Sequence, residues 1–140
     1  MFTSRKIVDL HPHTAALCEA FLIACRHHEI DVIITCTYRD DEAQAELYAQ
    51  GRTKPGKIVT NARGGMSYHN YGLAADFCLI VDGKVSWAVD KNWMAVIAIF
   101  ESYGWESGHR WKFKDSPHVQ KTFGKTIAQL AATKQQYPSL

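Results

Sequence analysis

The chain has 140 residues, of which 46% are hydrophobic and 21% are charged, and its formal net charge at pH 7 is +2. This composition is typical of a folded globular protein and excludes a disordered or fibrous chain. So small a net charge does not support nucleic-acid binding, which usually depends on a clustered basic face. Since no apolar run is long enough for a signal peptide or a membrane span, we expect a protein made in the cytoplasm, without membrane insertion.

The length predicts one domain over residues 1–140, because no repeat, low-complexity segment or linker divides the sequence. The cysteines form no CxxC pair and no spacing typical of a disulfide framework. We expect all four to be reduced residues of the core, and a thiolate metal site is the less favoured interpretation. The cysteines are Cys18, Cys25, Cys36 and Cys78.

The first half of the chain predicts two helices, one strand and a long connection. Apolar side chains recur every three to four residues over 13–28, which indicates an amphipathic helix. Residues 31–37 are rich in β-branched side chains and predict a strand. A second helix is expected over 40–50, with an aspartate near its start and a glycine after its end. The connection 51–66 is rich in Gly, Lys and Arg, and a loop of this length in a compact domain is usually functional.

The second half begins with an apolar run over 74–81 that predicts a buried strand. Asp82 and Gly83 then predict a two-residue hairpin turn into a short strand over 84–87. A third helix, an irregular segment and a last helix are expected over 90–103, 105–118 and 121–134. Helices that alternate with a few hairpin-linked strands predict an α+β domain with a small antiparallel sheet.

One carboxylate, Asp76, lies inside the apolar run 74–81. A buried carboxylate is costly unless a charge, hydrogen bonds or a metal compensates it. An ion pair with Arg39 or Arg63 is one possible compensation. The other is a metal, for which His69 is the nearest ligand. His69 stands in a preceding stretch of Gly, Ser, Tyr and Asn that we expect to be irregular.

A second acid and histidine stand together further along the chain, as Asp115 and His118 in the stretch DSPH. Three nitrogen and oxygen ligands, with a fourth position open to water, are the arrangement of a catalytic zinc site. His69, Asp76 and His118 would supply these ligands. Asp115 would then lie beside the metal, where it could take a proton from water and deliver it to a leaving amine.

Three motifs, in the right order, resemble those of the zinc peptidases that cut bacterial cell-wall peptides. That family includes the phage L-alanyl-D-glutamate endopeptidases (endolysins) and the D-alanyl-D-alanine carboxypeptidases. Its S-x-H-x-x-G-x-A-x-D signature is complete from Ser67 to Asp76, and its acid-x-x-His signature is Asp115 to His118. The upstream pattern of the family is carried by Tyr38, Arg39, Gln44, Leu47, Tyr48 and Gly51. The resemblance covers roughly residues 30–121.

The resemblance implies an α+β fold of the Hedgehog and D-Ala-D-Ala peptidase type, with a zinc site in a cleft. It implies one Zn²⁺ per chain, bound by His69, Asp76 and His118. By the same resemblance, Asp115 is the general base, and Arg39 polarises the scissile carbonyl and holds the developing oxyanion.

Three further residues are expected to bind substrate or to support the site. Ser67 would orient the substrate or the ligand loop, and Gln44 would contact the substrate or a residue beside the metal. Trp111 could be either a substrate platform or a core residue.

The chain departs from the family pattern in one segment. Many phage members have Glu-Trp-Gly-Gly-Asp-Trp before the second motif, and here Ser107, His109 and Arg110 replace the usual Trp, Gly and Asp. If this segment lines the substrate groove, the bond preference or the affinity would differ. The catalytic set itself is unchanged.

We therefore expect a zinc peptidase that hydrolyses the peptide stem of peptidoglycan. The favoured form is a monomeric phage or prophage endolysin that cuts L-alanyl-D-glutamate bonds, has no separate cell-wall-binding domain, and reaches the wall from the cytoplasm at lysis. Three alternatives stay open: a D-alanyl-D-alanine carboxypeptidase, a non-catalytic zinc-containing wall-binding module, and a phage tail component.

Overall fold

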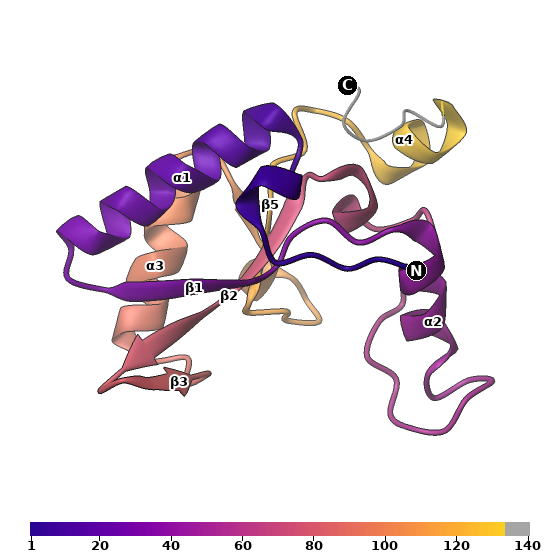
Figure 1. The fold of residues 1–140 in the computed structure, drawn as a ribbon, viewed down its shortest axis with the longest axis horizontal. Coiled ribbons are helices and arrows are strands. Elements are labelled where there is room, and N and C mark those ends of the chain that lie inside the picture. The colour runs from indigo at the N-terminus through magenta and orange to yellow at the C-terminus, as the bar shows by residue number, and fades with distance from the viewer. Residues whose placement is uncertain (134–140) are drawn as a thin grey trace.

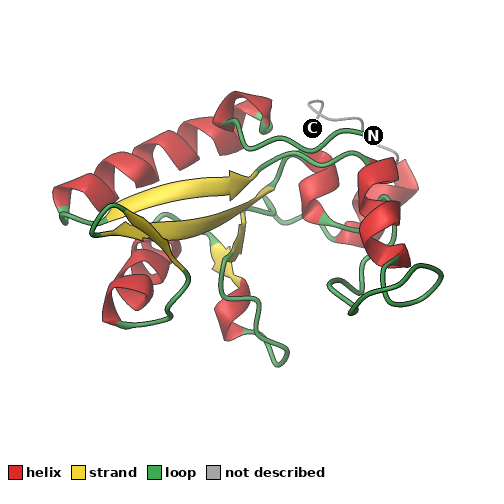
Figure 2. Cartoon of the chain, turned by 60° about the horizontal axis from the view of Figure 1, so that its bottom comes forward, coloured by secondary structure: helices red, strands yellow, loops and turns green. Residues whose placement is uncertain are grey.

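Two helices, α1 and α3, pack against an antiparallel sheet, and a separate group of elements around α2 and α4 extends beyond one end of that sheet (Figures 1 and 2). The computed structural model describes residues 1–133. Its helices are α1 (Pro12–His27), α2 (Asp41–Ala49), α3 (Lys91–Ser102) and α4 (Ile127–Thr133), with 3-10 turns η1 (Ile7–Asp9), η2 (Tyr68–Tyr71) and η3 (Gly108–Arg110). Its strands are β1 (Asp31–Cys36), β2 (Ala74–Val81), β3 (Lys84–Ser86), β4 (Glu106–Ser107) and β5 (His118–Gln120).

Strand β2 is the centre of the sheet, whose order is β1-β2-β5-β4, with β3 paired to the far end of β2. All of these pairings are antiparallel. The register places Asp76 opposite Cys36 on β1 and opposite His118 on β5. Strands from three distant parts of the sequence therefore meet at Asp76.

The main core lies between the sheet and the helices α1 and α3. Aromatic side chains dominate it: Phe21 of α1 stacks on Phe100 of α3, and Phe100 also contacts Phe77 of β2 and Trp105. A smaller cluster joins α4 to η2 through Leu130, Tyr71 and Leu73. Burial of one large apolar side chain stabilises the fold by about 1.5–3 kcal/mol, so the aromatic contacts fix the two helices against β2.

Most of the expected elements are confirmed to within two residues, and the α+β architecture is as predicted. The hairpin turn is also confirmed, because Asp82 and Gly83 both have positive φ (51° and 74°), as a type I′ turn requires. The four cysteines are buried and unpaired, as expected. No helix among residues 1–133 has the length and apolar character to cross a membrane.

Three expectations were wrong. The segment around His69 is not irregular but forms η2, and the segment 105–118 contains β4 and η3. Strands of two and three residues are too short to show an alternating pattern, so β4 and β5 left no signal in the sequence. The last helix begins at Ile127 rather than at residue 121, because Phe123 and Gly124 have φ values of 52° and 75° that a helix does not accommodate. Its expected end, at residue 134, lies outside the described residues.

The aromatic contacts predict the position of greatest sensitivity in the core. Replacement of Phe100 by Ala should lower the free energy of unfolding by about 3–5 kcal/mol, because it leaves a cavity between Phe21, Phe77 and Trp105. Urea denaturation followed by circular dichroism measures the loss. The exposed Asn92 on the same helix is the control, and its replacement by Ala should change the stability by less than about 0.5 kcal/mol. A similar loss in both variants would contradict this account of the core.

Candidate metal centre and active site

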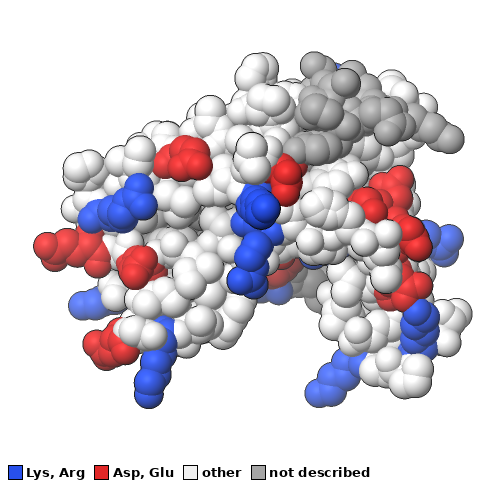
Figure 3. Space-filling model, in the orientation of Figure 1, with Lys and Arg blue, Asp and Glu red and all other residues white. Residues whose placement is uncertain are grey.

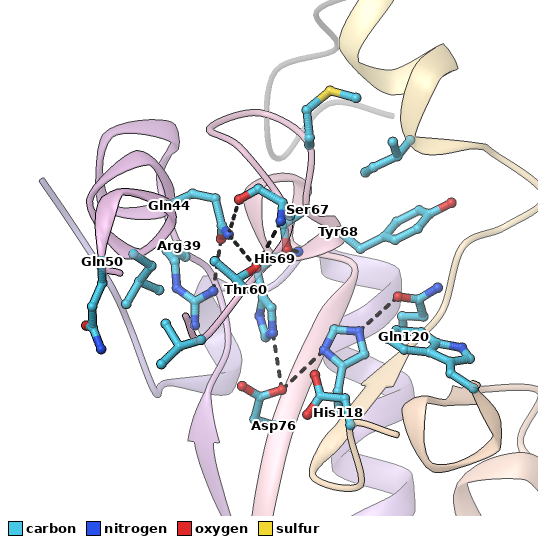
Figure 4. A pocket seen from close by; sticks show the side chains of 17 residues that line it. Arg39, Gln44, Gln50, Thr60, Ser67, Tyr68, His69, Asp76, His118 and Gln120 are labelled. Atoms are coloured by element: carbon cyan, nitrogen blue, oxygen red, sulfur yellow. Dashed lines mark hydrogen bonds and ion pairs between the residues drawn. The ribbon is translucent and has the colours of Figure 1, made fainter. Parts of the chain in front are cut away.

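Three ligand-type side chains converge at the point where β2, β5 and η2 meet (Figure 4). Asp76 Oδ1 lies 3.2 Å from His69 Nε2 and 3.3 Å from His118 Nδ1. The centroids of the two imidazole rings lie 5.0 Å apart, and the ring planes meet at 73°. The ion pair of Asp76 with an arginine that the sequence allowed is not formed, since Asp76 contacts the two histidines instead.

The turn η2 carries His69, and local hydrogen bonds set its geometry. The hydroxyl of Ser67 accepts the His69 backbone N–H at 3.3 Å, and the Asn70 side chain accepts the Ser67 N–H at 3.1 Å. Gly72 ends the turn with a φ of 68°, a left-handed conformation that glycine adopts without strain. Ser67 thus orients the backbone of the turn, and Gly72 returns the chain into β2 so that His69 faces Asp76.

In each histidine, the ring nitrogen that faces away from Asp76 forms a hydrogen bond to the protein. His69 Nδ1 donates to the Thr37 carbonyl at 2.7 Å, and His118 Nε2 donates to the Gln120 side-chain oxygen at 2.9 Å. The amide of Gln120 is oriented by its NH₂ group, which donates to Glu106 at 3.2 Å. In their neutral forms the histidines would therefore point lone pairs at Asp76, and three acceptors around one point require a cation. Metal-binding histidines in proteins are held in this way by their second nitrogen, so this donor set fits a zinc ion.

The electrostatics of the cluster point the same way. Burial alone would lower the pKa of His69, but the charge and hydrogen bond of Asp76 outweigh burial and raise the pKa to about 10. Burial would raise the pKa of Asp76, but the charges and hydrogen bonds of His69 and His118 hold it well below its usual range. The carboxylate thus stabilises positive charge at this point, whether as protons or as a metal.

Arg39 lies at the edge of the cluster and is held by two side chains. Its Nη1 donates to the Gln44 oxygen at 2.9 Å and its Nη2 to Cys36 Sγ at 3.2 Å. Its Nε is buried and has no partner among the described residues. The guanidinium is therefore fixed in place and retains an unused donor.

Gln44 is almost fully buried, with 1% exposure, and its polar atoms bond to the protein. Besides the bond to Arg39, its NH₂ group donates to the Ala62 carbonyl at 2.9 Å and to the Thr60 hydroxyl at 3.4 Å. Of the two roles that the sequence allowed for Gln44, these contacts favour support of Arg39 over direct contact with substrate.

Cys36 was not among the expected site residues. Its sulfur lies 3.8 Å from His69 Nδ1, and Cys36, His69 and Asp76 are close enough to form a possible ligand group. The sulfur contacts the ring nitrogen that already bonds to Thr37, however, whereas Nε2 faces Asp76. The geometry therefore favours His118 over Cys36 as the third ligand. Only the pairing of β1 with β2 reveals that Cys36 lies opposite Asp76.

Asp115 lies at the rim of the same site, where its side chain is exposed to the cleft. Partial burial within the cleft raises its pKa, and the charge of Asp76 adds to this, against the opposing charges of His118, His69 and Arg39. Its backbone oxygen accepts the His118 N–H at 3.1 Å. A carboxylate beside the converging ligands, with a raised pKa, suits proton transfer.

A cleft of about 740 Å³ brings together all eight residues that the sequence predicted for the site. Figure 3 shows a hollow at the lower edge of the molecule, between the sheet and the part formed by α2 and the loop after it. The predicted residues that line the cleft are Arg39, Gln44, Ser67, His69, Asp76, Trp111, Asp115 and His118. Trp111 lies beside His118, with ring centroids 5.2 Å apart, so it belongs to the cleft and not to the core.

The connection 51–66 forms the opposite wall of this cleft through Val59, Thr60, Ala62 and Met66. Side chains from α2 and just after it hold this loop. Arg52 donates to the carbonyls of Tyr48 and Thr60 at 2.6 and 3.0 Å and to the Asn61 side chain at 3.1 Å. These bonds, with those of Gln44, make the wall an ordered structure.

The charge on Asp76 predicts the protonation state of His69 in the metal-free protein. His69 should stay an imidazolium at about pH 8, where an ordinary histidine is neutral, because its pKa is raised to about 10. Two-dimensional ¹H–¹⁵N spectra of the imidazole rings report this state. In the Asp76→Asn variant His69 should be neutral at the same pH, since the charge that holds its proton is gone. A neutral His69 in the unsubstituted, metal-free protein would contradict this electrostatic account.

Comparison with known proteins gives the family. A family model described as D-alanyl-D-alanine carboxypeptidase matches residues 60–121. The chain is 46% identical over 122 residues to the peptidoglycan L-alanyl-D-glutamate endopeptidase CwlK of Bacillus subtilis. This match covers 80% of this chain and 73% of CwlK.

Solved structures agree with this result. The L-Ala D-Glu endopeptidase ChiX of Serratia marcescens is 27% identical to this chain. The two structures superpose with a TM-score of 0.61, over 87% of this chain and 90% of ChiX. The LD-carboxypeptidase LdcB, at 14% identity, shares the fold with a TM-score of 0.67 over 91% of this chain and 65% of LdcB. The fold that the motifs implied is therefore confirmed. On its identity to CwlK and its match to the family model, the chain is an enzyme that belongs to the family of cell-wall metallopeptidases, which includes D-alanyl-D-alanine carboxypeptidases and L-alanyl-D-glutamate endopeptidases.

Proposed function

We propose that the protein is a zinc-dependent peptidase that hydrolyses the peptide stem of peptidoglycan at L-alanyl-D-glutamate bonds. The observation that carries this proposal is the convergence of His69 Nε2, Asp76 Oδ1 and His118 Nδ1 in a cleft that also holds Asp115 and Arg39. The activities of CwlK and ChiX support the choice of bond.

His69, Asp76 and His118 would hold the zinc ion and leave its remaining position open to the cleft. Bound zinc supplies Lewis acidity, which lowers the pKa of water and polarises a carbonyl group. The hydrogen bonds from the two histidines to Thr37 and Gln120 keep the imidazoles in the correct tautomer and orientation.

Asp115 acts as the general base. Its carboxylate takes a proton from the attacking water and later delivers that proton to the nitrogen of the departing amine. Its raised pKa suits both roles, because a carboxylate that holds a proton more tightly than usual is a better base and can still act as the acid.

Arg39 stabilises the negative charge that develops on the carbonyl oxygen of the substrate. Its two terminal nitrogens are held by Gln44 and Cys36, so the charged guanidinium is already oriented at the edge of the cleft. A fixed donor of this kind pays little reorganisation cost as the charge develops.

The shape of the cleft favours an endopeptidase. A second hollow shares Arg39, Leu47 and Gln50 with the main cleft, and a third shares six residues with it, among them Thr60, Trp111 and Asp115. These two hollows have no residue in common, so one adjoins the cleft on the Arg39 side and the other on the Asp115 side. A peptide could continue on both sides of the scissile bond, as an internal cut requires.

A second candidate is a D-alanyl-D-alanine carboxypeptidase, which the description of the matching family model favours. The two activities release different products, so mass spectrometry separates them. The phage or prophage origin and the action at host lysis stay predictions, supported by the resemblance of the motifs to those of endolysins.

Digestion of purified peptidoglycan tests the proposed activity. The zinc-loaded protein should release fragments cut between L-alanine and D-glutamate, and a zinc chelator should abolish the release because the ligand set no longer holds its metal. Loss of a single terminal D-alanine would instead establish the carboxypeptidase. In Asp115→Asn, kcat should fall by about 10²–10⁴, with the zinc content unchanged. If this variant keeps full activity, Asp115 is not the base.

Substitutions of Arg39 and Gln44 separate charge from orientation. Arg39→Lys keeps the charge but loses the fixed planar group, and kcat should fall by about 10²–10³ with the bound zinc unchanged. Gln44→Ala removes the bond that orients Arg39, so a smaller loss of kcat is expected. Steady-state kinetics on a soluble stem peptide, with zinc content by elemental analysis, measure both. A loss in Gln44→Ala that appears only in KM would show that Gln44 binds substrate.

A further inference from the structure

The segment in which Ser107, His109 and Arg110 replace the usual residues of the family packs against the stretch that carries the proposed base. The segment forms β4 and η3, and none of these three side chains is among those that line the main cleft. These side chains therefore do not form the wall of that cleft. Of the three, only the His109 side chain is hydrogen-bonded to the stretch 115–118.

The backbone of Asp115 rests directly on Gly108. The Asp115 N–H donates to the Gly108 carbonyl at 2.9 Å. A Cβ on Gly108 would lie only 2.4 Å from the Asp115 carbonyl oxygen, so only glycine permits this approach. This contact fixes the position of the Asp115 backbone relative to η3.

Ser116, the residue after Asp115, is held from two sides. His109 Nδ1 lies 2.8 Å from the Ser116 hydroxyl, and the Ser116 carbonyl accepts from the indole N–H of the buried Trp93 at 3.2 Å. The His109 backbone N–H in turn donates to the Ser107 hydroxyl at 3.1 Å, which caps η3. His109 therefore connects a capped turn to the peptide unit that follows the base.

Arg110 lies on the same turn but bonds elsewhere. Its guanidinium makes two bonds to Glu101 of α3, at 3.1 and 3.0 Å, at the exposed surface. Neither of these bonds reaches the stretch 115–118, so Arg110 offers a matched control on η3.

We propose that His109 is a positioning residue for Asp115: its hydrogen bond to the Ser116 hydroxyl fixes the backbone next to the base and so the aim of the carboxylate into the cleft. This inference rests on the proposed role of Asp115 as the general base. The glycine that many phage members of the family have at this position has no side chain and cannot make the bond. The substitution at residue 109 is thus a feature that this chain adds to its active site.

Kinetics of variants on both sides of the bond test the proposal. In His109→Ala and in Ser116→Ala, kcat should fall about tenfold with little change in KM, because a small misplacement of a base is costly. The double variant should lose no more than either single variant, since both remove one bond. His109→Asn can place an amide group where Nδ1 lies, so its activity should stay within about twofold of the unsubstituted enzyme. Arg110→Ala should also be unchanged.

Two results would overturn the positioning role while the proposed function stands. One is full kcat in His109→Ala when Asp115→Asn is inactive. The other is a loss in His109→Ala that neither Ser116→Ala reproduces nor His109→Asn rescues, because the hydrogen bond would then not be the cause.

Hydrogen exchange tests the proposal without reference to activity. The Asp115 amide should exchange faster in His109→Ala and Ser116→Ala, and at the original rate in His109→Asn and Arg110→Ala. Equal rates in all four variants would contradict the inference. If the unsubstituted, zinc-loaded protein cuts no stem peptide, the proposed function fails by itself, and the exchange rates still decide whether His109 orders the Asp115 backbone.

Discussion

The carboxylate of Asp76 lies between two imidazoles, and the other parts of the site are arranged around this contact. A partly buried acid between two buried histidines requires a positive charge, which protons or a metal supply. Each histidine is fixed on its far side by an oxygen of the protein, so the positions of the lone pairs are set before any ion binds. The fold therefore prepares the metal centre in advance.

The pairing register of β2 is the structural cause of this arrangement. Asp76 faces Cys36 on one neighbouring strand and His118 on the other, and a shift by one residue would turn Asp76 to the opposite face. The aromatic core beneath the sheet, where Phe77 contacts Phe100, resists such a shift. Core packing thus fixes the position of the carboxylate, although none of the core residues faces the cleft.

The groups proposed for catalysis are held by bonds to the backbone and to neighbouring side chains. Arg39 is held by Gln44 and Cys36, and Gln44 also bonds to the loop that forms the opposite wall of the cleft. Asp115 is held through its backbone by Gly108 and through its neighbour Ser116 by His109. The guanidinium and the base are thus each fixed relative to the proposed metal ligands, which is the preorganisation that hydrolysis requires.

The sequence by itself determined the main helices and strands, since periodic apolar patterns and the Asp-Gly turn are local signals. It also identified eight of the residues that line the cleft, because the motifs keep chemically necessary residue types at characteristic spacings. Only the tertiary structure decided that β4 and β5 exist, that Cys36 lies beside His69, and that His109 bonds to Ser116. These features depend on contacts between separate segments of the chain, and such contacts leave no pattern within any one segment.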